Sequence, residues 1–587
     1  MTTLSFHFHG YQPGDIVRWL EPDPLKAPRV EERSSPVSLR IGGDRVAGSN
    51  WTDAVLRSYG RLETILAHVS GVASVDVEPQ TLAWLCERDP DAYRRLISAW
   101  SEGSVGLVMT PPFHPILPQH HRADRETLFD IMIDFYAPLL RHNEGPVGLW
   151  LPECAYSSET AEGYLDAARG APLHIDGLPD LTGGVHLLLD ARQLAASEVS
   201  TTAWARTGLD GGLRFAVRDP GLSGDFAFGG SRGSAFAAAV RSRGADSLLV
   251  AADLESLLAS PDQGKRFIEI VGAVRDAGVT VAAPAPPPRP MAADVLDYSS
   301  WSDYDEHLLH GRTSDTRWTG VRRSDGAVVS RVHKSEPVSQ IWKHAFTLVT
   351  EQIEGAVRLA GPKVLKRLGL EHRSTALRRL LLAYARHVFR AHYRACGLGS
   401  SEVAFETAAT SILRGKVDVE IAGFLARGYL AMLMGLRSDP RFWDNLDTRV
   451  TFQNVACLAQ ALVDTSEACA RAGDADLAAR LLRLMRAALL EFSEAYSRLG
   501  LSDLRGASGW EATEGAWFRA VESEVPRKSP IDVVRRATLY GAGDALASRL
   551  PGSTKMPRGD LAADTGHIVG EAQGQWDNQE WCEHRSG

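Results

Sequence analysis

Cysteine is scarce in this chain. The 587 residues include six cysteines, and no two of them form a C-x-x-C pair: Cys86, Cys154, Cys396, Cys457, Cys469 and Cys582. This pattern argues against a disulfide-stapled fold and against a four-ligand zinc cluster. The sequence also lacks an apolar run that could cross a bilayer, and its first residues do not resemble a signal peptide. We therefore expect a cytoplasmic protein with no membrane partner.

Clustered positive charge is also missing. The chain has 64 Lys and Arg residues against 73 Asp and Glu residues, which gives a formal net charge of −9. A protein that binds nucleic acid usually gathers Lys and Arg on one face or along one helix. The sequence offers no such block, so we expect no nucleic-acid partner. A mildly acidic protein is compatible with a neutral substrate.

The apolar content is that of an ordinary globular protein, at 44% hydrophobic residues. To about residue 330, short apolar runs alternate with helical patterns. The expected strands are residues 4–9, 74–77, 105–109, 147–151 and 247–252, and the clearest helical stretches are 53–68 and 125–140. This alternation predicts an α/β fold with a parallel sheet covered by helices, and its length suits a closed barrel.

Helical spacing dominates from about residue 340 to residue 499. Two apolar stripes recur there: Leu377, Leu380, Leu381, Tyr384 and Val388, then Leu477, Leu481, Leu484, Ala488 and Phe492. Such stripes are usually core faces, so we expect an all-helical second domain packed against the barrel. The last stretch is rich in Gly, Pro, Asp and Gln. We expect a catalytic barrel over 1–335, a helical domain over 336–510 and a largely irregular or disordered extension over 511–587.

Four polar clusters fall where predicted strands end, which is where barrel enzymes build their sites. His7 and His9 share one face of the first strand. They could bind a metal, hydrogen-bond to sugar hydroxyls, or be one buried and one surface histidine. His114 stands in a loop with four prolines, Pro111, Pro112, Pro115 and Pro118. That loop is rigid, and its histidine is either functional or simply exposed.

Acidic residues follow two of the strands. Trp150 and Glu153 end the run Gly148-Leu-Trp-Leu-Pro-Glu, and a tryptophan there could stack on a sugar ring. Asp253 ends a strongly apolar strand. Glu255 would share the face of Asp253 if the extended backbone continued. The alternative is that Asp253 caps a helix that starts near Glu255.

Carboxylates from two strands suit glycoside chemistry. A retaining glycosidase uses one ionised carboxylate as nucleophile and a second, protonated one as general acid, about 5–5.5 Å apart. A desolvated acid near another negative charge keeps its proton at neutral pH. Upstream, Arg218 and Asp225 lie in a polar turn between apolar flanks, which could be no more than a loop.

These clusters together resemble glycoside hydrolase family 57. The matching segments are His7-Phe-His-Gly-Tyr-Gln-Pro, His114-Pro-Ile-Leu-Pro, Trp150-Leu-Pro-Glu-Cys-Ala-Tyr, Arg218-Asp with Leu222-Ser, Asp253-Leu-Glu and Ser300-Trp. The resemblance covers roughly residues 1–330 and is most specific at Trp150–Glu153. The family includes α-amylases, 4-α-glucanotransferases and α-glucan branching enzymes. It implies an irregular parallel (β/α)7-type barrel followed by helices.

The resemblance also implies roles for residues. Glu153 is expected to be the nucleophile and Asp253 the general acid/base. The substrate-binding residues are expected to be His7, His9, His114, Trp150, Arg218, Asp225, Glu255 and Trp301. The chemistry requires no metal and no cofactor, and its partner is a carbohydrate substrate, an α-glucan or maltooligosaccharide. The alternative is a degenerate barrel that binds a glycan or a protein partner without turnover.

Asp219 and Asp225 also lie in matching segments, so the choice of Asp253 as acid needs a reason. Asp225 follows Gly224 in a polar turn, where water should leave it ionised. Asp219 lies beside Arg218, whose charge would favour the carboxylate. Asp253 ends an apolar strand, where desolvation favours the protonated acid.

Overall fold

The computed structural model describes the barrel and the helices that follow it. The residues described are 2–11, 17–18, 23–26, 29–30, 40–41, 44–45, 59–143, 145–171, 175, 177–182, 184–194, 204–206, 213–258, 261–286, 291–292, 294–301, 316–320, 330–333, 336–413, 415–442 and 449–498. Residues 511–587, for which we expect an irregular extension, lie outside this set.

Seven parallel strands form the barrel wall. In spatial order they are β12 (Ser247–Asp253), β1 (Thr3–Gly10), β6 (Ala73–Val77), β7 (Gly106–Met109), β8 (Val147–Trp150), β9 (Val185–Asp190) and β11 (Arg214–Arg218). Every neighbouring pair along this series is parallel. The predicted (β/α)7-type barrel is therefore confirmed.

The barrel closes imperfectly between β11 and β12. The described residues of these two strands form no ladder, but the N–H of Asp219 donates to the carbonyl of Leu249 at 2.8 Å. Three short strands add to the wall: antiparallel β10 (Trp204–Arg206) beside β11, β14 (Met291–Ala292) beside β10, and β13 (Thr280–Val281) beside β1. These additions make the barrel irregular.

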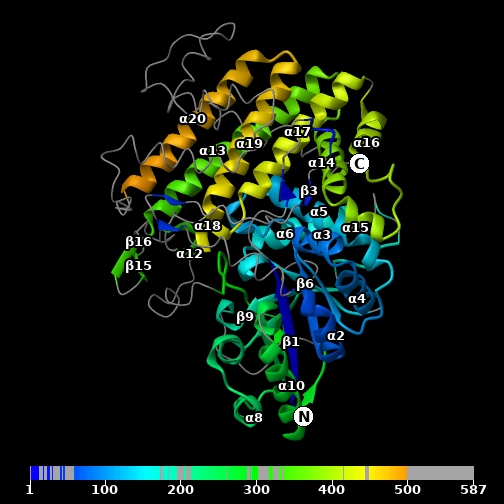
Figure 1. Ribbon diagram of the computed structural model, residues 1–587, viewed down its shortest axis with the longest axis vertical. Helices are drawn as coiled ribbons and strands as arrows, with labels where there is room; N and C mark the ends of the chain where they lie inside the picture. The colour runs from blue at the N-terminus through cyan, green and yellow to red at the C-terminus, as the bar shows by residue number, and fades with distance from the viewer. Residues whose placement is uncertain are drawn as a thin grey trace.

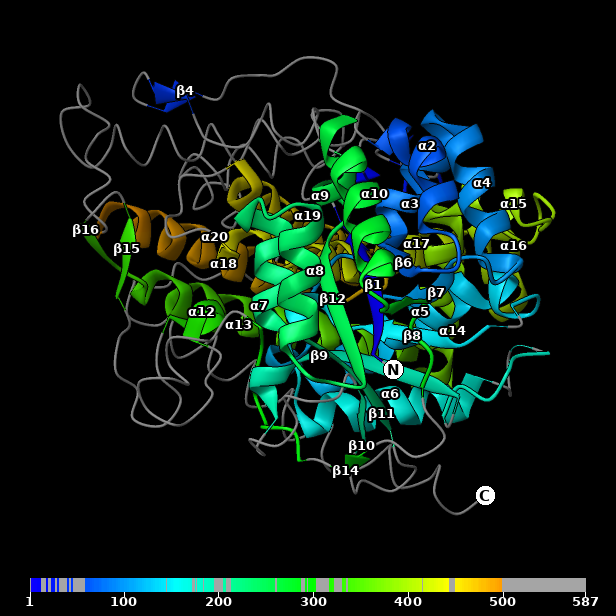
Figure 2. The ribbon, with the colours of Figure 1, turned by 90° about the horizontal axis from the view of Figure 1, so that it is seen from below.

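Helices cover the outside of the wall (Figures 1 and 2). They are α2 (Leu62–Val69), α3 (Pro79–Arg88), α4 (Pro90–Ser101), α5 (Arg122–Leu140), α6 (Ser158–Gly170), α8 (Gly233–Ser242) and α10 (Pro261–Asp276). The alternation along β1 divides its side chains. Phe6 and Phe8 pack outward against Phe267 of α10, whereas His7 and His9 face Trp150 across the interior. The polar site is thus inside the barrel.

The second half of the chain is helical and lies along one side of the barrel (Figure 1). Its helices are α12 (Thr316–Thr319), α13 (Ile341–Arg367), α14 (Arg373–Val388), α15 (Arg390–Ala395), α16 (Phe405–Ile412), α17 (Lys416–Gly435), α18 (Asp439–Phe442), α19 (Arg449–Arg471) and α20 (Ala475–Arg498). This confirms the predicted helical region. On the barrel side, Asp124 of α5 accepts hydrogen bonds from Arg358 and from Tyr429.

Short strand pairs occur outside the barrel. They are β2 (Val17–Arg18) with β3 (Arg29–Val30), β4 (Arg40–Ile41) with β5 (Asp44–Arg45), and β15 (Ser330–His333) with β16 (Glu336–Ser339). Among the described residues, no helix combines the length and the hydropathy that a membrane span needs.

Two local expectations need correction. The segment after Arg218 is helical rather than a polar turn, since α7 (Pro220–Gly224) continues into a π-helix, η7 (Asp225–Gly229). Helix α7 begins there because the Asp219 side chain accepts a hydrogen bond from the backbone N–H of Leu222 and because Pro220 fits the first helical position. The backbone after Asp253 does not stay extended, because α9 (Glu255–Leu258) begins at Glu255. Asp253 and Glu255 therefore do not share a strand face.

Candidate active site

Glu153 lies in a tight turn directly after β8. The turn is a short 3-10 segment, Pro152–Cys154, in which Glu153 has φ 61° and ψ 18° and Cys154 has φ 51°. Left-handed backbone is costly for residues other than glycine, and such strain gathers at functional sites. The Glu153 side chain is almost buried, at 8% exposure, and the indole Nε1–H of Trp301 donates to its Oε2 at 2.6 Å. The carboxylate is therefore held in a fixed position.

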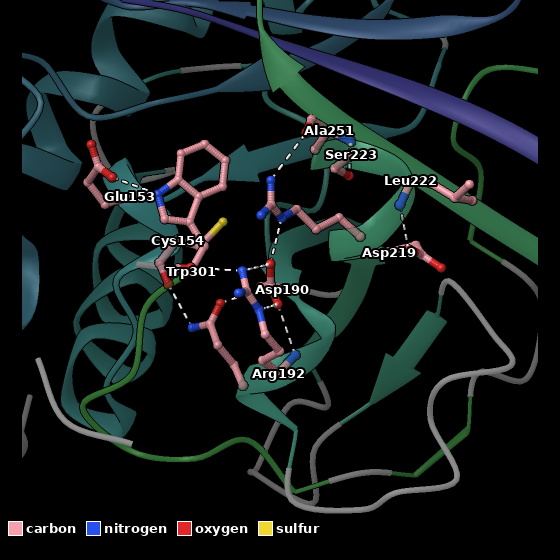
Figure 3. A network of polar contacts seen from close by, with 11 residues as sticks. Glu153, Cys154, Asp190, Arg192, Asp219, Leu222, Ser223, Ala251 and Trp301 are labelled. Carbon is pink, nitrogen blue, oxygen red and sulfur yellow. Dashed lines mark hydrogen bonds and ion pairs between the residues drawn. The ribbon is translucent and has the colours of Figure 1, made fainter. Parts of the chain in front are cut away.

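A charged network holds Trp301 in place (Figure 3). The guanidinium carbon of Arg218 lies 4.5 Å from the centre of the Trp301 ring, and Arg192 donates to the Trp301 carbonyl at 2.8 Å. Both arginines bind the fully buried carboxylate of Asp190, Arg218 through Nε at 2.6 Å and Arg192 through Nε at 2.7 Å. Burial would raise the pKa of Asp190, but the charge of Arg218 and the contacts from Arg192 outweigh it and lower that pKa.

The two histidines of β1 both bind one buried carboxylate, Asp76, at the end of β6. His7 Nε2 lies 3.0 Å from Asp76 Oδ1, and His9 Nδ1 lies 2.8 Å from Asp76 Oδ2. His7 Nδ1 also lies 3.0 Å from the hydroxyl of Ser74. Burial lowers the pKa of His7 despite the bond to Asp76. His9 and Asp76 therefore form the charged pair of this cluster, and His7 is its neutral member.

His114 completes the histidine cluster from the loop after β7. Its Nε2 lies 3.0 Å from His9 Nε2, and its Nδ1 lies 2.7 Å from the hydroxyl of Ser438, which comes from the C-terminal helices. The backbone of Ser438 also donates to the carbonyl of His114 at 2.9 Å. Burial and the charge of His9 hold the pKa of His114 well below its usual value. His114 is thus neutral.

Aromatic rings form a continuous wall beside these groups. Tyr11 stacks on His114 with 3.9 Å between centroids, His9 stacks on Trp150 at 4.8 Å, and Trp150 meets the edge of Trp301 at 5.1 Å. Asp439 fixes the Tyr11 hydroxyl, which donates to it at 2.6 Å. Flat, rigid aromatic faces of this kind suit the apolar faces of sugar rings.

Asp253 and Glu255 lie on the other side of His9. Asp253 is the register neighbour of His9 on the adjacent strand and keeps contact with solvent. Desolvation by the surrounding protein raises the pKa of Asp253, against the opposing charges of His9 and Arg218. Burial and the charge of Asp253 raise the pKa of Glu255 to about 7, while the hydroxyl of Tyr59 donates to Glu255 at 2.8 Å. These two acids titrate together and hold a proton more readily than ordinary carboxyls.

The structure thus brings most of the expected site residues into one connected network. These residues are His7, His9, His114, Trp150, Glu153, Arg218, Asp253, Glu255 and Trp301. Asp225 is the one expected site residue that lies outside this network. The β-carbon that a residue at Gly229 would carry lies 2.2 Å from Asp225 Oδ1, so this carboxylate folds back against its own π-helix, and Arg266 binds the Asp225 carbonyl at 3.1 Å.

Several residues of the network were not singled out from the sequence. Asp76 and Asp190 each end or nearly end a barrel strand, so the reasoning applied to Asp253 could have found them. Ser438 and Asp439 carry no local signal, because they reach the site from a distant helical segment. As for metals, no group of three His, Cys, Asp or Glu side chains within the described part of the chain has an arrangement suited to an ion.

Comparison with known proteins adds an independent line of evidence. The sequence profile of the maltose-forming alpha-amylase-like N-terminal domain matches residues 1–285, and that of the corresponding C-terminal domain matches residues 317–563. The structure is similar to that of an exo-type maltose-forming amylase from Pyrococcus sp. ST04. The two share 31% sequence identity with a TM-score of 0.72, and the match covers 97% of this chain and 95% of that chain.

More distant likenesses also occur among solved structures. A 4-alpha-glucanotransferase from Thermococcus litoralis has 15% identity and a TM-score of 0.41, over 73% of this chain and 60% of that one. A GH57-type branching enzyme from Pyrococcus horikoshii has 11% identity and a TM-score of 0.41, over 87% and 96%. No protein of curated function matches the sequence.

Proposed function

The chain belongs to the maltose-forming alpha-amylase-like family, and from that premise we propose that it is a retaining α-glucan-active enzyme of glycoside hydrolase family 57. Its substrate is an α-glucan or a maltooligosaccharide. The near full-length similarity to an exo-type maltose-forming amylase supports hydrolysis, with release of maltose from a chain end. The observation that carries the proposal is the placement of Glu153, which is nearly buried at the carboxyl edge of the barrel with an N–H donor on its carboxylate.

In the first step, the Glu153 carboxylate attacks the anomeric carbon and the glycosidic C–O bond breaks. Asp253 donates its proton to the leaving oxygen, so a covalent glycosyl-enzyme and a shortened or released sugar result. In the second step, Asp253 takes a proton from water, and that water attacks the anomeric carbon and frees Glu153. An acceptor sugar hydroxyl in place of water would give transfer rather than hydrolysis. The raised pKa of Asp253 fits its first role.

The residues around the two acids have supporting roles. Trp301 holds the Glu153 carboxylate, and Arg218 holds the Trp301 ring. The partly exposed ring of Tyr11, supported by His114 beneath it, is a candidate stacking surface for the sugar. We also propose that residues 1–335 form the catalytic unit and 336–510 the helical unit; the matched family segments, 1–285 and 317–563, also divide the chain in two, but the second begins before residue 336 and runs past residue 510.

The direct test is Glu153→Gln, which keeps the shape and removes the attacking anion. We expect activity on maltooligosaccharides to fall by several orders of magnitude with unchanged thermal unfolding. Glu162→Gln on the exposed face of α6 is the matched control and should retain full activity. A Glu153→Gln enzyme with a tenth of wild-type turnover would exclude Glu153 as the nucleophile.

Asp253 needs a separate test, because its role is proton transfer. Asp253→Ala should lose far more activity on natural glucans than on substrates whose leaving group needs no proton, and azide should restore turnover. If Asp225→Ala shows this signature instead, the acid is wrongly assigned. The product profile from maltooligosaccharides distinguishes hydrolysis from transfer. A wild-type protein that binds glucan without any product would support the binding-only alternative.

A further inference from the structure

Every ring nitrogen of His9 and His114 already has a hydrogen-bond partner within the protein, and both ring nitrogens of His7 lie close to polar side chains. His7 contacts Ser74 and Asp76, His9 contacts Asp76 and His114, and His114 contacts His9 and Ser438. All of these distances lie between 2.7 and 3.0 Å. The arrangement does not leave a ring N–H of His9 or His114 over for a sugar hydroxyl. His9 and His114 are therefore better placed to hold charge than to hydrogen-bond the substrate.

The partners fix most of the protons. A carboxylate only accepts, so Asp76 receives Nδ1–H from His9, while His7 Nε2 lies 3.0 Å from Asp76 Oδ1 without forming a hydrogen bond. His7 Nδ1 shares a hydrogen bond with the hydroxyl of Ser74. Between His9 Nε2 and His114 Nε2, at 3.0 Å, one nitrogen carries a proton and the other accepts it. Two arrangements satisfy this contact: charged His9 donating to His114, or neutral His9 accepting from His114.

The surroundings of His9 favour the charged form. Titratable groups face it from several elements: Asp76 on β6, His114 after β7, Asp253 on β12, Glu255 on α9, and His7 and Tyr11 on its own segment. Burial opposes a charge on His9, but Asp76, Asp253 and Glu255 outweigh it and raise the pKa of His9 to about 9. His114 must then be the neutral acceptor, with its Nδ1–H donated to Ser438.

We propose that Asp76 and Ser438 are positioning residues that together keep a permanent positive charge on His9 beside the acid/base Asp253. Asp76 stabilises the imidazolium directly. Ser438 acts one step further away, because it accepts the Nδ1–H of His114 and so leaves Nε2 of His114 free to accept from His9. The proposal rests on the proposed function for the role of Asp253, but the charge on His9 does not depend on it.

The charge has a use in a two-step reaction. Asp253 must first lose a proton to the leaving oxygen and later regain one from water, so its pKa must be neither too low nor too high. Desolvation by the surrounding protein raises the pKa of Asp253, and so does the negative charge of Asp76. The charge of His9 opposes both. Ser438 comes from the C-terminal helices, so that part of the chain contributes to the protonation of the barrel site.

The charge can be measured directly by NMR titration of full-length enzyme labelled with ¹⁵N-histidine. The His9 signal is identified by its loss in His9→Gln. We expect His9 to titrate near pH 9 in the wild type, below about pH 7 in Asp76→Asn, and about one unit lower than wild type in Ser438→Ala. Ser74→Ala is the matched control, because Ser74 contacts His7 and not His9, and it should leave the His9 titration unchanged.

The pH–rate profile gives the second readout. The alkaline limb of kcat/KM reports the pKa of Asp253, which the charge of His9 lowers and the charge of Asp76 raises. His9→Gln removes only the first charge, so its limb should move about one unit higher, whereas Asp76→Asn removes both charges and should move the limb less. Ser438→Ala keeps His9 charged below about pH 8, so it should leave the limb nearly in place. A wild-type His9 that titrates near 6.5, or a His9 titration shift in Ser74→Ala equal to that in Ser438→Ala, would overturn the proposal. If Asp76→Asn does not fold, Ser438→Ala decides. If Glu153→Gln stays active while His9 titrates as expected, the proposed function fails and the charge stands.

Discussion

Replacement of Trp301 by phenylalanine isolates the hydrogen bond that holds the proposed nucleophile. The change removes the indole N–H that donates to Glu153 Oε2 at 2.6 Å and keeps an aromatic ring at the same place. That ring can still lie under the Arg218 guanidinium, which is 4.5 Å from the Trp301 centroid, and against the edge of Trp150. The substitution should therefore affect Glu153 more than it affects the fold.

The magnitude follows from the type of bond. A hydrogen bond to a charged group contributes about 1.5–3 kcal/mol, about twice the value of a neutral one. If the whole of that energy orients Glu153 for attack, kcat/KM should fall about 10- to 150-fold. The expected cost in unfolding free energy is below about 1 kcal/mol, because Trp301 lies at the edge of the apolar cluster inside the barrel rather than within it.

Trp318→Phe is the matched control. Its indole N–H donates to the hydroxyl of Ser300 at 3.1 Å, one residue before Trp301, and its side chain is fully buried. This variant should lose about 1–3 kcal/mol of unfolding free energy and keep kcat/KM within about fivefold. Steady-state kinetics and urea unfolding on both variants suffice. A Trp301→Phe enzyme within threefold of wild type, or equal kinetic losses in both variants, would refute the reasoning.

Three further outcomes are expected. Asp464→Asn breaks a buried pair in which Arg427 donates two hydrogen bonds, each of 2.8 Å. The free energy of unfolding in urea should fall by about 3–5 kcal/mol. The control Glu420→Gln loosens an exposed pair with Arg471 and should cost below about 1 kcal/mol. The pKa of Glu255 is raised to about 7. Its protonated form therefore stabilises the fold fully below about pH 4.5, and this stabilisation is lost as the pH rises to about 7. Glu255→Gln does not titrate, so over this pH range its free energy of unfolding should rise by about 1–3 kcal/mol relative to wild type. Chelators should leave activity unchanged, since carboxylate chemistry needs no metal, and a loss that zinc restores would contradict this.

The sequence predicted five of the seven barrel strands, because their residues either alternate between apolar and polar, as in β1 and β6, or form nearly continuous apolar runs, as in β12. The two missed strands have weaker signals. β9 (Val185–Asp190) carries a histidine within its apolar run, and β11 (Arg214–Arg218) is five residues long with arginine at both ends. The helix expected over 53–68 appears as α2 from Leu62, and its first residues lie outside the described part of the chain. The helix expected over 125–140 extends back to Arg122.

The site was predictable where chemistry and strand ends coincide in the sequence. Glu153, Asp253 and the β1 histidines follow that rule. Their partners do not, because spatial contact cannot be found from local spacing: Ser438 is 324 residues from His114, and Asp439 is 428 residues from Tyr11. The backbone conformation of Glu153 could not be predicted either. Left-handed turns usually contain glycine, and neither Glu153 nor Cys154 is a glycine.

The left-handed residues carry a further consequence. Among the described residues, five non-glycine residues have positive φ, and four of them form two adjacent pairs at the site, Phe113 with His114 and Glu153 with Cys154. Glycine at such a position relieves about 1 kcal/mol or more of backbone strain. Function and folding therefore oppose one another at these positions. A random library screened only for heat resistance should accumulate glycine at position 153, and its most stable members would keep the barrel fold but lose catalytic activity.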